Sequence, residues 1–285
     1  MIGSNTKAYC SGDNYKAKTE IRMRIGLIGD GAISRYVRAK AVEHGHEVRA
    51  LLLRPERRLA RRSTPDDPLC ISSVTDIPDS VDHMIDCAGH SALQSYGADI
   101  LRNGTDLTTV SIGALADPRL CKDLEKAAIK GGSRLHLASG AIGALDCLRA
   151  ARIGKLNNVT YIGRKPPQSW KGSPAESRCD LDALTTGAKT HFKGSARNAA
   201  IDYPKNANVA AAVALAGLGF DDTEVELIAD ADISENIHEI HAAGEFGSFS
   251  FEIRGHSLAE NPRSSALAAM SVVSKLEQET QRITF

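Results

Sequence analysis

The sequence predicts an α/β protein that combines a doubly wound parallel sheet with a second α/β (α+β) domain. A short apolar run at residues 25–28 leads into a glycine-rich turn and an amphipathic helix. Apolar runs then alternate with helical patterns as far as residue 140, and the pattern changes after that point. Alternation of this kind favours parallel strands joined by right-handed crossovers.

The turn after the first predicted strand has the composition of a pyrophosphate site. Gly29 and Gly31 allow a tight turn and the close approach of a ligand. The N–H groups and the dipole of the helix that follows favour negative charge. The segment resembles the G-x-G-x-x-G fingerprint of Rossmann sheets, with Ser34 at the third glycine position, although an ordinary strand-to-helix turn is the alternative. The cofactor-binding residues predicted here are Gly29, Gly31, Ala32 and Ile33.

Further strands and helices complete the first domain. Strands are expected at residues 47–53, 81–87, 107–112 and 135–138, and helices at residues 88–103 and 118–131. The segment 54–68 is rich in Arg and Pro, so we expect a loop or a short helix there.

The end of the second predicted strand bears on cofactor choice. An NAD site usually has an acidic residue there for the ribose hydroxyls, but this chain has no acid before Glu56. Arg54, Arg57 and Arg58 offer cations for a 2′-phosphate instead. We therefore expect NADP or NAD with NADP favoured, the alternative being a solvated basic loop.

The second domain has a different pattern. Strands are expected at residues 159–164, 190–194, 225–229, 237–243 and 248–254, with helices ending near 153 and at 196–201 and 209–218 and loops at 168–188. Residues 165–167 contain two prolines, which should end the first of these strands. The glycine turn at residues 244–247 makes the last two strands a hairpin.

Length and composition indicate a soluble protein of two domains. The chain has 285 residues, with 42% apolar and 25% charged residues and zero formal net charge. Zero net charge gives no electrostatic reason to expect nucleic acid or an anionic membrane as a partner. No apolar run approaches the roughly 18 residues of a membrane span, so we expect neither partner. The six cysteines form no C-x-x-C pair and none has a histidine at metal-ligand spacing, so we expect reduced thiols in a cytoplasm and no metal.

We divide the chain by these patterns. Residues 1–21 are a flexible extension, residues 22–140 a dinucleotide-binding domain and residues 141–261 a catalytic domain. Pro262 should start a final helix in the segment 262–285, which packs back on the first domain. The apolar positions that predict its packing face are Leu267, Met270, Val273 and Leu276.

Several stretches in order carry a family resemblance. They are Cys87-Ala88-Gly89-His90, Ser111-Ile112-Gly113-Ala114-Leu115, Gly140-Ala141-Ile142-Gly143-Ala144-Leu145-Asp146, Gly163-Arg164-Lys165-Pro166, Tyr203-Pro204-Lys205-Asn206-Ala207-Asn208-Val209-Ala210, Asn236-Ile237-His238-Glu239 and Asn261-Pro262-Arg263-Ser264-Ser265. From about Arg24 to near the C-terminus, the chain resembles an L-aspartate dehydrogenase.

The resemblance implies the oxidation of L-aspartate to iminosuccinate with NAD(P). Iminosuccinate hydrolyses to oxaloacetate and ammonia, or it feeds NAD biosynthesis. The family's catalytic histidine corresponds to His238, and its cofactor contacts correspond to Ala141 and Asn208. We also assign Ala88 and Gly89 to the cofactor site and expect a homo-oligomer, a dimer.

The implied chemistry fits these residue types. The substrate amine must lose a proton before an imine forms, and histidine titrates near neutrality. The two substrate carboxylates need cations, for which Arg164, Lys165 and Lys205 are the candidates. His90 is a further candidate to line the substrate site.

Each candidate also has a structural explanation. His238 can be a surface histidine or a satisfied core histidine near the start of a strand. Asn208 can cap the helix after it, and Lys165 can belong to a solvated loop. His90 can simply start a helix. His241 should lie on the opposite strand face from His238 and be structural.

Three other functions stay open. A homoserine dehydrogenase has a similar first domain but uses a lysine and aspartate apparatus. A dihydrodipicolinate reductase uses a His-His run that this chain lacks. An NAD(P)-sensing regulator needs no site for substrate carboxylates, so turnover on an amino acid would exclude it.

Overall fold

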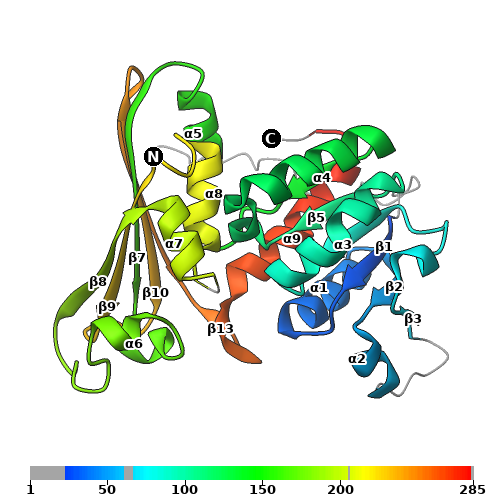
Figure 1. Ribbon diagram of the computed structural model, residues 1–285, viewed down its shortest axis with the longest axis horizontal. Helices are drawn as coiled ribbons and strands as arrows, with labels where there is room; N and C mark the ends of the chain where they lie inside the picture. Colours follow the sequence, from blue (N-terminus) through cyan, green and yellow to red (C-terminus); the bar gives the residue numbers. More distant parts are fainter. Residues whose placement is uncertain (1–22, 61–66, 205, 284–285) are drawn as a thin grey trace, which may run out of the picture.

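The computed structural model describes residues 23–60, 67–204 and 206–283 and shows two domains side by side (Figure 1). The flexible extension predicted for residues 1–21 lies outside this described part, and so does Lys205. Within the described part, no helix is both long enough and apolar enough to cross a membrane.

The first domain is built on a six-stranded parallel sheet in the order β3-β2-β1-β4-β5-β6. Its strands are β1 (Arg24–Ile28), β2 (Glu47–Leu52), β3 (Leu69–Ile71), β4 (His83–Asp86), β5 (Asp106–Thr109) and β6 (Leu135–Leu137). Its helices are α1 (Ala32–Glu43), α2 (Pro55–Ala60), α3 (His90–Arg102) and α4 (Pro118–Gly131), with 3₁₀ helices η1 (Val74–Asp76) and η2 (Ile112–Ala116). The central strands are almost wholly buried, which is expected where helices cover both sides of a parallel sheet. Of these strands, β1 contains a continuous apolar run, whereas β4 and β5 also contain buried His, Asp and Thr side chains. The predicted doubly wound parallel sheet is confirmed.

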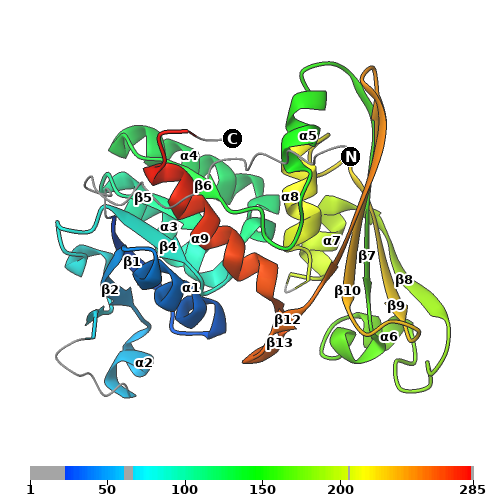
Figure 2. The same ribbon diagram turned by 180° about the vertical axis from the view of Figure 1, so that it is seen from behind.

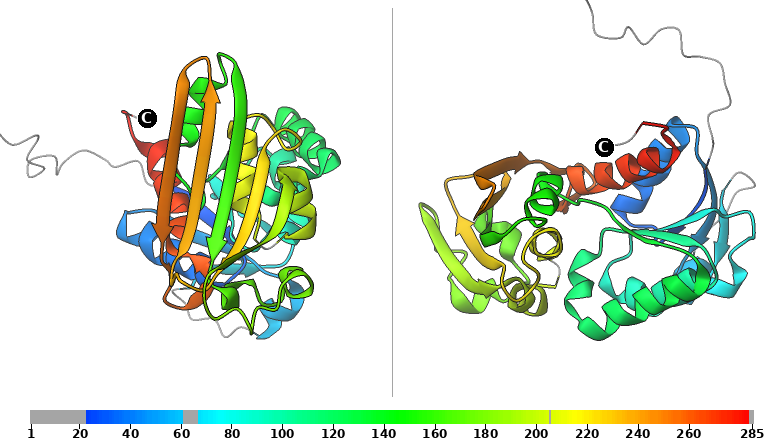
Figure 3. Two further views of the ribbon diagram at one scale, coloured as in Figure 1. Left: turned by 90° about the vertical axis from the view of Figure 1, so that its left-hand side faces the viewer. Right: turned by 90° about the horizontal axis from the view of Figure 1, so that it is seen from above.

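The second domain is a five-stranded mixed sheet in the order β11-β10-β7-β9-β8, in which only β7 and β9 pair in parallel. Its strands are β7 (Leu156–Lys165), β8 (Ala188–Ser195), β9 (Glu224–Asp230), β10 (Asn236–Gly244) and β11 (Gly247–Gly255). Its helices are α5 (Leu145–Ala151), α6 (Ala175–Arg178), α7 (Ala196–Asp202) and α8 (Asn208–Ala216), with the 3₁₀ helix η3 (Pro167–Trp170). Helices α5, α7 and α8 lie between this sheet and the first domain (Figures 1 and 3). The α+β character of the second domain and the β10–β11 hairpin are confirmed.

The C-terminal segment differs from the prediction at its start. Pro262 lies in the short strand β13 (Asn261–Ser265), which pairs with β12 (Ser257–Leu258), and not at the start of a helix. Helix α9 (Ala266–Thr280) begins four residues later. The prediction for Pro262 is therefore wrong, because a two-stranded edge ladder accepts a proline as readily as a first helical turn does.

Helix α9 returns to the first domain and lies alongside α1 (Figure 2). Val272, Val273 and Leu276 join Val37 and Ala41 of α1 in one core cluster. The chain thus passes through the second domain and then covers the face of the first sheet on which α1 lies.

The packing face of α9 is rotated from the predicted one. Met270 was expected in the apolar stripe, but its side chain is 46% exposed. Ala269 and Val272 are buried instead. The prediction for Met270 is wrong because the predicted apolar positions recur every three residues, whereas an α-helix turns once in 3.6 residues, so such a row drifts around the helix.

We expect Leu276→Ala to lower the free energy of unfolding by about 2–5 kcal/mol, because the leucine is fully buried and its removal leaves a cavity between α9 and α1. Met270→Ala on the same helix is the matched control and should change it by less than about 0.5 kcal/mol. Urea unfolding measures both variants. Equal effects would contradict the observed packing face.

Candidate active site

The loops that follow β1, β2 and β4 meet at the carboxyl edge of the parallel sheet. They line a cavity of about 400 Å³, and Gly29, Gly31, Arg54 and Ala88 are among its lining residues. Ligands of doubly wound sheets bind at this edge. The structure therefore brings four of the predicted cofactor residues to one cavity.

The glycine turn fits a pyrophosphate. Gly29 has φ of +89°, and a Cβ atom there would lie 2.9 Å from the Cβ atom of Ala88. A Cβ at Gly31 would meet nothing within 4 Å, so this position opens on space that a ligand can use. No side chain caps the start of α1 at Ala32, which leaves its first N–H groups for an anion.

Ser34 fits the third glycine position by a hydrogen bond. It is buried, and its hydroxyl donates to the Gly29 carbonyl over 2.7 Å. The serine thus ties the first turn of α1 to the glycine turn. Ile33, one residue earlier, is half-buried and packs against the core.

The arginines after β2 differ in their position. Arg54 and Arg57 line the cavity, whereas Arg58 is not among its lining residues. The Arg54 carbonyl accepts hydrogen bonds from the N–H groups of Arg57 and Arg58, which starts α2. The side chain of Arg54 is exposed and therefore available to a ligand at the mouth of the cavity.

A buried carboxylate that the sequence analysis missed holds the next loop. Asp86 ends β4, and its Oδ1 accepts a hydrogen bond from the Ala88 N–H over 2.9 Å. Its Oδ2 accepts from the hydroxyls of Thr109 and Ser111 over 2.8 and 2.6 Å. Burial raises the pKa of Asp86, and these hydrogen bonds oppose that rise. The sequence feature that could have indicated this role is an acidic residue at the end of a predicted buried strand.

His90 and Asn208 meet across the domain boundary. The Nε2 atom of His90 lies 2.8 Å from Oδ1 of Asn208, and the Gly113 N–H donates to the same oxygen over 2.9 Å. Because that oxygen only accepts, His90 carries its proton on Nε2. A Cβ at Gly113 would lie 2.7 Å from His90, so only glycine leaves room for this contact.

Asn208 is not a helix cap. Helix α8 begins at Asn208, the capping position is Ala207, and no side-chain hydrogen bond caps the helix. The capping explanation for Asn208 is therefore wrong. Its amide connects α8 of the second domain with α3 and η2 of the first.

His238 is buried on the inner face of the second sheet. It is 4% exposed, and its Nδ1 atom lies 2.8 Å from the hydroxyl oxygen of Tyr161. Gly163 pairs with His238 across the strands, and a Cβ there would lie 2.7 Å from that hydroxyl. Burial and then the charge of Lys165 lower the pKa of His238 to about 3, so the ring is neutral at pH 7.

Lys165 lies on the same strand face as Tyr161 and Gly163, by the alternation of β7. Its Nζ atom is 5.2 Å from the centre of the Trp170 ring. No ion pair with a carboxylate is found for Lys165 among the residues that the structure describes. Burial lowers the pKa of Lys165 to about 8.

Arg164 points to the other face of the sheet. It pairs with Asp230 over 3.1 Å and lies 3.7 Å from Glu239. His241 is on that outer face too, 2.9 Å from the Ser250 hydroxyl, as strand alternation predicts. The structure thus separates Arg164 from His238 and Lys165.

Two further predicted residues lie in different surroundings. Ala141 is buried among apolar side chains, and the preceding Gly140 N–H donates to the Ser271 hydroxyl of α9 over 3.1 Å. Gly89 caps α3 with φ of +95°. Lys205 is outside the described residues and is not placed.

Comparison with known families agrees with both halves of this arrangement. The family described as "Homoserine dehydrogenase, NAD binding domain" matches residues 25–138. The family described as "Aspartate dehydrogenase, C-terminal" matches residues 146–279. The match of the nucleotide domain alone does not identify the substrate. The match of the second domain favours an aspartate dehydrogenase over a homoserine dehydrogenase.

Individual relatives cover nearly the whole chain. An L-aspartate dehydrogenase from Ruegeria pomeroyi is 53% identical over 90% of this chain and 92% of its own. One from Polaromonas sp. is 45% identical over 89% and 96%. The crystal structure of aspartate dehydrogenase from Thermotoga maritima is 25% identical, with a TM-score of 0.73, and covers 93% of this chain and 99% of its own. With its pyridine-nucleotide domain and its matching second domain, the chain belongs to the L-aspartate dehydrogenase family.

Proposed function

We propose that this protein is an NAD(P)-dependent L-aspartate dehydrogenase, which oxidises L-aspartate to iminosuccinate. Iminosuccinate then hydrolyses to oxaloacetate and ammonia, or it feeds NAD biosynthesis. The observation that carries the proposal is the buried His238–Tyr161 pair beside Lys165, which lies in the domain that the aspartate dehydrogenase family matches.

The proposed division of labour follows the burial and charge of the side chains. Lys165 has an ammonium group with no carboxylate partner in the described part of the structure, so it suits a substrate carboxylate. The buried ring of His238 is neutral and suits proton transfer with the substrate amine. Lys205 stays a candidate second cation.

In the proposed reaction, a dinucleotide held at the cavity of Gly29, Gly31 and Ala88 would supply the acceptor for the hydride that leaves the α-carbon. His238 takes the proton that the substrate amine loses, so that a carbon–nitrogen double bond can form. In the tautomer in which Nδ1–H donates to the Tyr161 oxygen, Nε2 of His238 has the free lone pair that accepts this proton. The same histidine then exchanges protons with the water that attacks the imine.

The charge of the substrate supports this assignment. Without substrate, burial and the Lys165 ammonium disfavour a charged His238 ring. A substrate carboxylate beside Lys165 would offset the lysine charge and raise the pKa of His238 toward the neutral range. Binding of a dicarboxylate thus prepares the histidine to accept a proton.

The remaining assignments belong to the same proposal. Gly29, Gly31, Ala32 and the loop at Ala88 hold the dinucleotide, and His90 and Asn208 border it where the domains meet. The division into residues 22–140 and 141–261, assembly as a homodimer and a cytoplasmic location are parts of the proposal too.

We propose that NADP is preferred to NAD, because Arg54 and Arg57 line the cavity. Arg54→Asp is expected to weaken NADP binding by about 10- to 150-fold, the equivalent of roughly 1.5–3 kcal/mol for a charge-assisted contact. Its effect on NAD binding should be much smaller.

Arg58→Asp is the matched control, because Arg58 lies in the same helix but not among the cavity-lining residues. Fluorescence titration with NADPH and NADH measures all three proteins. Equal NADPH dissociation constants for Arg54→Asp and the wild type would remove the proposed preference.

A substrate panel tests the function. NADPH and NADH formation is measured with L- and D-amino acids, and the reverse reaction with oxaloacetate plus ammonia. We expect L-aspartate to be the best substrate. Cofactor binding without turnover on any amino acid would indicate an NAD(P)-sensing protein. Turnover on homoserine alone would indicate a homoserine dehydrogenase.

A further inference from the structure

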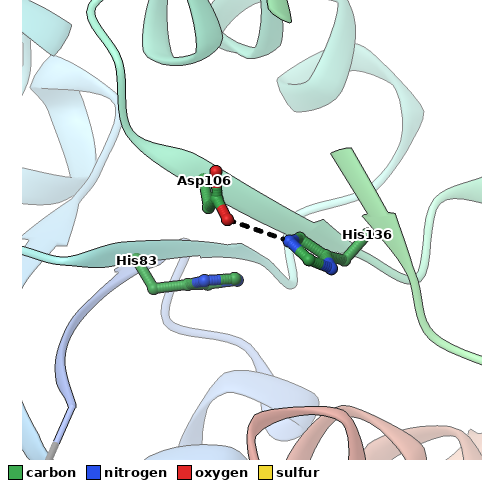
Figure 4. A group of neighbouring side chains, drawn as sticks. All are labelled: His83, Asp106 and His136. Atoms are coloured by element: carbon green, nitrogen blue, oxygen red, sulfur yellow. Dashed lines mark hydrogen bonds and ion pairs between the residues drawn. The ribbon is translucent and has the colours of Figure 1, made fainter. Parts of the chain in front are cut away.

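Two histidines and an aspartate from three neighbouring strands converge at the edge of the first sheet (Figure 4). They are His83 in β4, Asp106 in β5 and His136 in β6. One ring nitrogen of each histidine and a carboxylate oxygen all lie within 4.8 Å of one another. The closest pair is Nε2 of His136 and Oδ2 of Asp106, at 3.1 Å.

The register of the sheet produces this cluster. His83 pairs with Asp106, and Thr108 pairs with His136. In parallel strands, paired residues and residues two apart project from one face, so all of these side chains point the same way. His83 and Asp106 are the first residues of their strands, so the cluster lies at the edge opposite the nucleotide loops.

Each imidazole ring has a polar partner outside the three-residue cluster. Nδ1 of His136 lies 3.2 Å from Oε1 of Glu279 in α9, and Nε2 of His83 lies 2.7 Å from the Thr108 hydroxyl. Metal-binding histidines characteristically have such outer partners, which fix the ring and its tautomer. Both histidines are also buried, so their orientation is already set by packing.

Two cations lie nearby. Arg134 is 3.3 Å from Oδ2 of Asp106, and Lys275 is 3.2 Å from Glu279. The Arg134 side chain is 70% exposed and can turn to solvent at little cost. Asp106 and Glu279 would then remain to offset the charge of a bound cation.

We propose that His83, Asp106 and His136 form a binding site for a divalent ion of the Zn²⁺ class, with water completing its coordination. Two imidazoles and one carboxylate favour such an ion over Mg²⁺ or Ca²⁺, which prefer oxygen ligands. Ligands at roughly 2.0–2.2 Å from zinc lie about 3.5 Å apart. Because the ligand atoms lie within 4.8 Å of one another, their separations must shorten by at most about 1.3 Å. The site is structural, because it lies at the far edge of the sheet from the nucleotide cavity.

Titration with Zn²⁺ and with Co²⁺ tests the proposal on the full-length protein. We expect one bound ion per chain, a melting temperature that rises with Zn²⁺ but not with Mg²⁺, and visible absorption from bound Co²⁺. The dissociation constant for NADPH should be unchanged by the metal. Wild-type protein that binds no Zn²⁺ at 100 µM would overturn the proposal.

Variants locate the ion. His136→Gln and Asp106→Asn should weaken Zn²⁺ binding by at least about 10- to 100-fold, and Glu279→Gln by about the same factor. Arg134→Ala should strengthen it by removing a competing cation. His241→Gln, an exposed histidine of the second sheet, is the control and should bind as the wild type does.

These variants also separate the metal site from the simplest alternative, an ion-pair clamp between α9 and the sheet. A clamp predicts that Arg134→Ala lowers the melting temperature and that added Zn²⁺ changes nothing. Zn²⁺ binding that persists in His136→Gln would place the ion elsewhere, for example on a cysteine, and would also overturn the proposal.

Discussion

Replacing His238 with alanine is expected to lower turnover on L-aspartate by about 10²- to 10⁴-fold, the usual contribution of general acid–base catalysis. NADPH binding should stay near the wild-type value, because the nucleotide cavity is lined by residues of the first domain. Single-turnover and steady-state kinetics measure the loss. Since His238 is buried, His238→Asn accompanies it as a variant that leaves a smaller cavity.

The pH dependence of the His238 variants has a definite sign. The neutral ring accepts the proton, so activity is present above the pKa of His238 and falls as the pH drops through it. In the free enzyme that pKa is lowered to about 3, so the acid limb of kcat/KM should lie well below neutrality. The limb of kcat reports the substrate complex and should lie at higher pH. Both limbs should be lost in His238→Ala.

Tyr161→Phe tests how much the Tyr161 hydroxyl contributes to positioning the His238 ring. It keeps the ring and removes the hydroxyl that lies 2.8 Å from Nδ1 of His238. Turnover should fall less than in His238→Ala, and the acid limb should shift but persist. Wild-type turnover with an unchanged limb in His238→Ala would show that the base lies elsewhere, with His90 and Lys165 the next to replace.

Local patterns predicted the elements of the nucleotide half well. The turn and the helix after Gly29 are joined by a contact only five residues apart, between the Ser34 hydroxyl and the Gly29 carbonyl. Helix α4 has the predicted bounds of Pro118–Gly131. The phase of α9 depends on a partner surface on α1, which periodicity alone does not identify. Met270 was therefore assigned to the wrong face.

The orientation of the site residues was also difficult to predict from local patterns. Arg164 and Lys165 are both predicted as substrate cations because the two carboxylates need positive partners, and the predicted strand ends before Lys165. Strand β7 in fact includes both residues, so alternation sends them to opposite faces. Because β7 extends one residue further than predicted, Lys165 lies on the same sheet face as His238 and Arg164 lies on the opposite face.

Contacts between distant segments left little sign in the sequence. Asn208 bonds His90 from 118 residues away, and Asp86 binds hydroxyls 23 and 25 residues further on. His83, Asp106 and His136 come from three separate strands, so they do not form a metal-ligand motif with a recognisable spacing in the sequence. Such contacts follow from sheet order and register, which the sequence predicts only as a class of fold.

Replacing Lys165 with methionine is expected to weaken the binding of a substrate-like dicarboxylate by about 10- to 150-fold, because a charge-assisted contact of roughly 1.5–3 kcal/mol is lost. Succinate is a suitable probe, since it has both carboxylates and no amine that titrates. Its dissociation constant is measured by isothermal titration calorimetry with the enzyme saturated by cofactor, so that a variant without turnover can be measured too.

The pH dependence identifies the role of Lys165. Its pKa is lowered to about 8, so the ammonium is present below pH 8 and is lost as the pH rises through that value. Succinate binding to the wild type should therefore weaken above about pH 8. Lys165→Arg keeps its charge at every pH used and should bind succinate without this limb. Lys165→Met should show weak binding and no limb. If Lys165→Met instead binds succinate as the wild type does but loses turnover, Lys165 is the proton acceptor and a different cation holds the carboxylate.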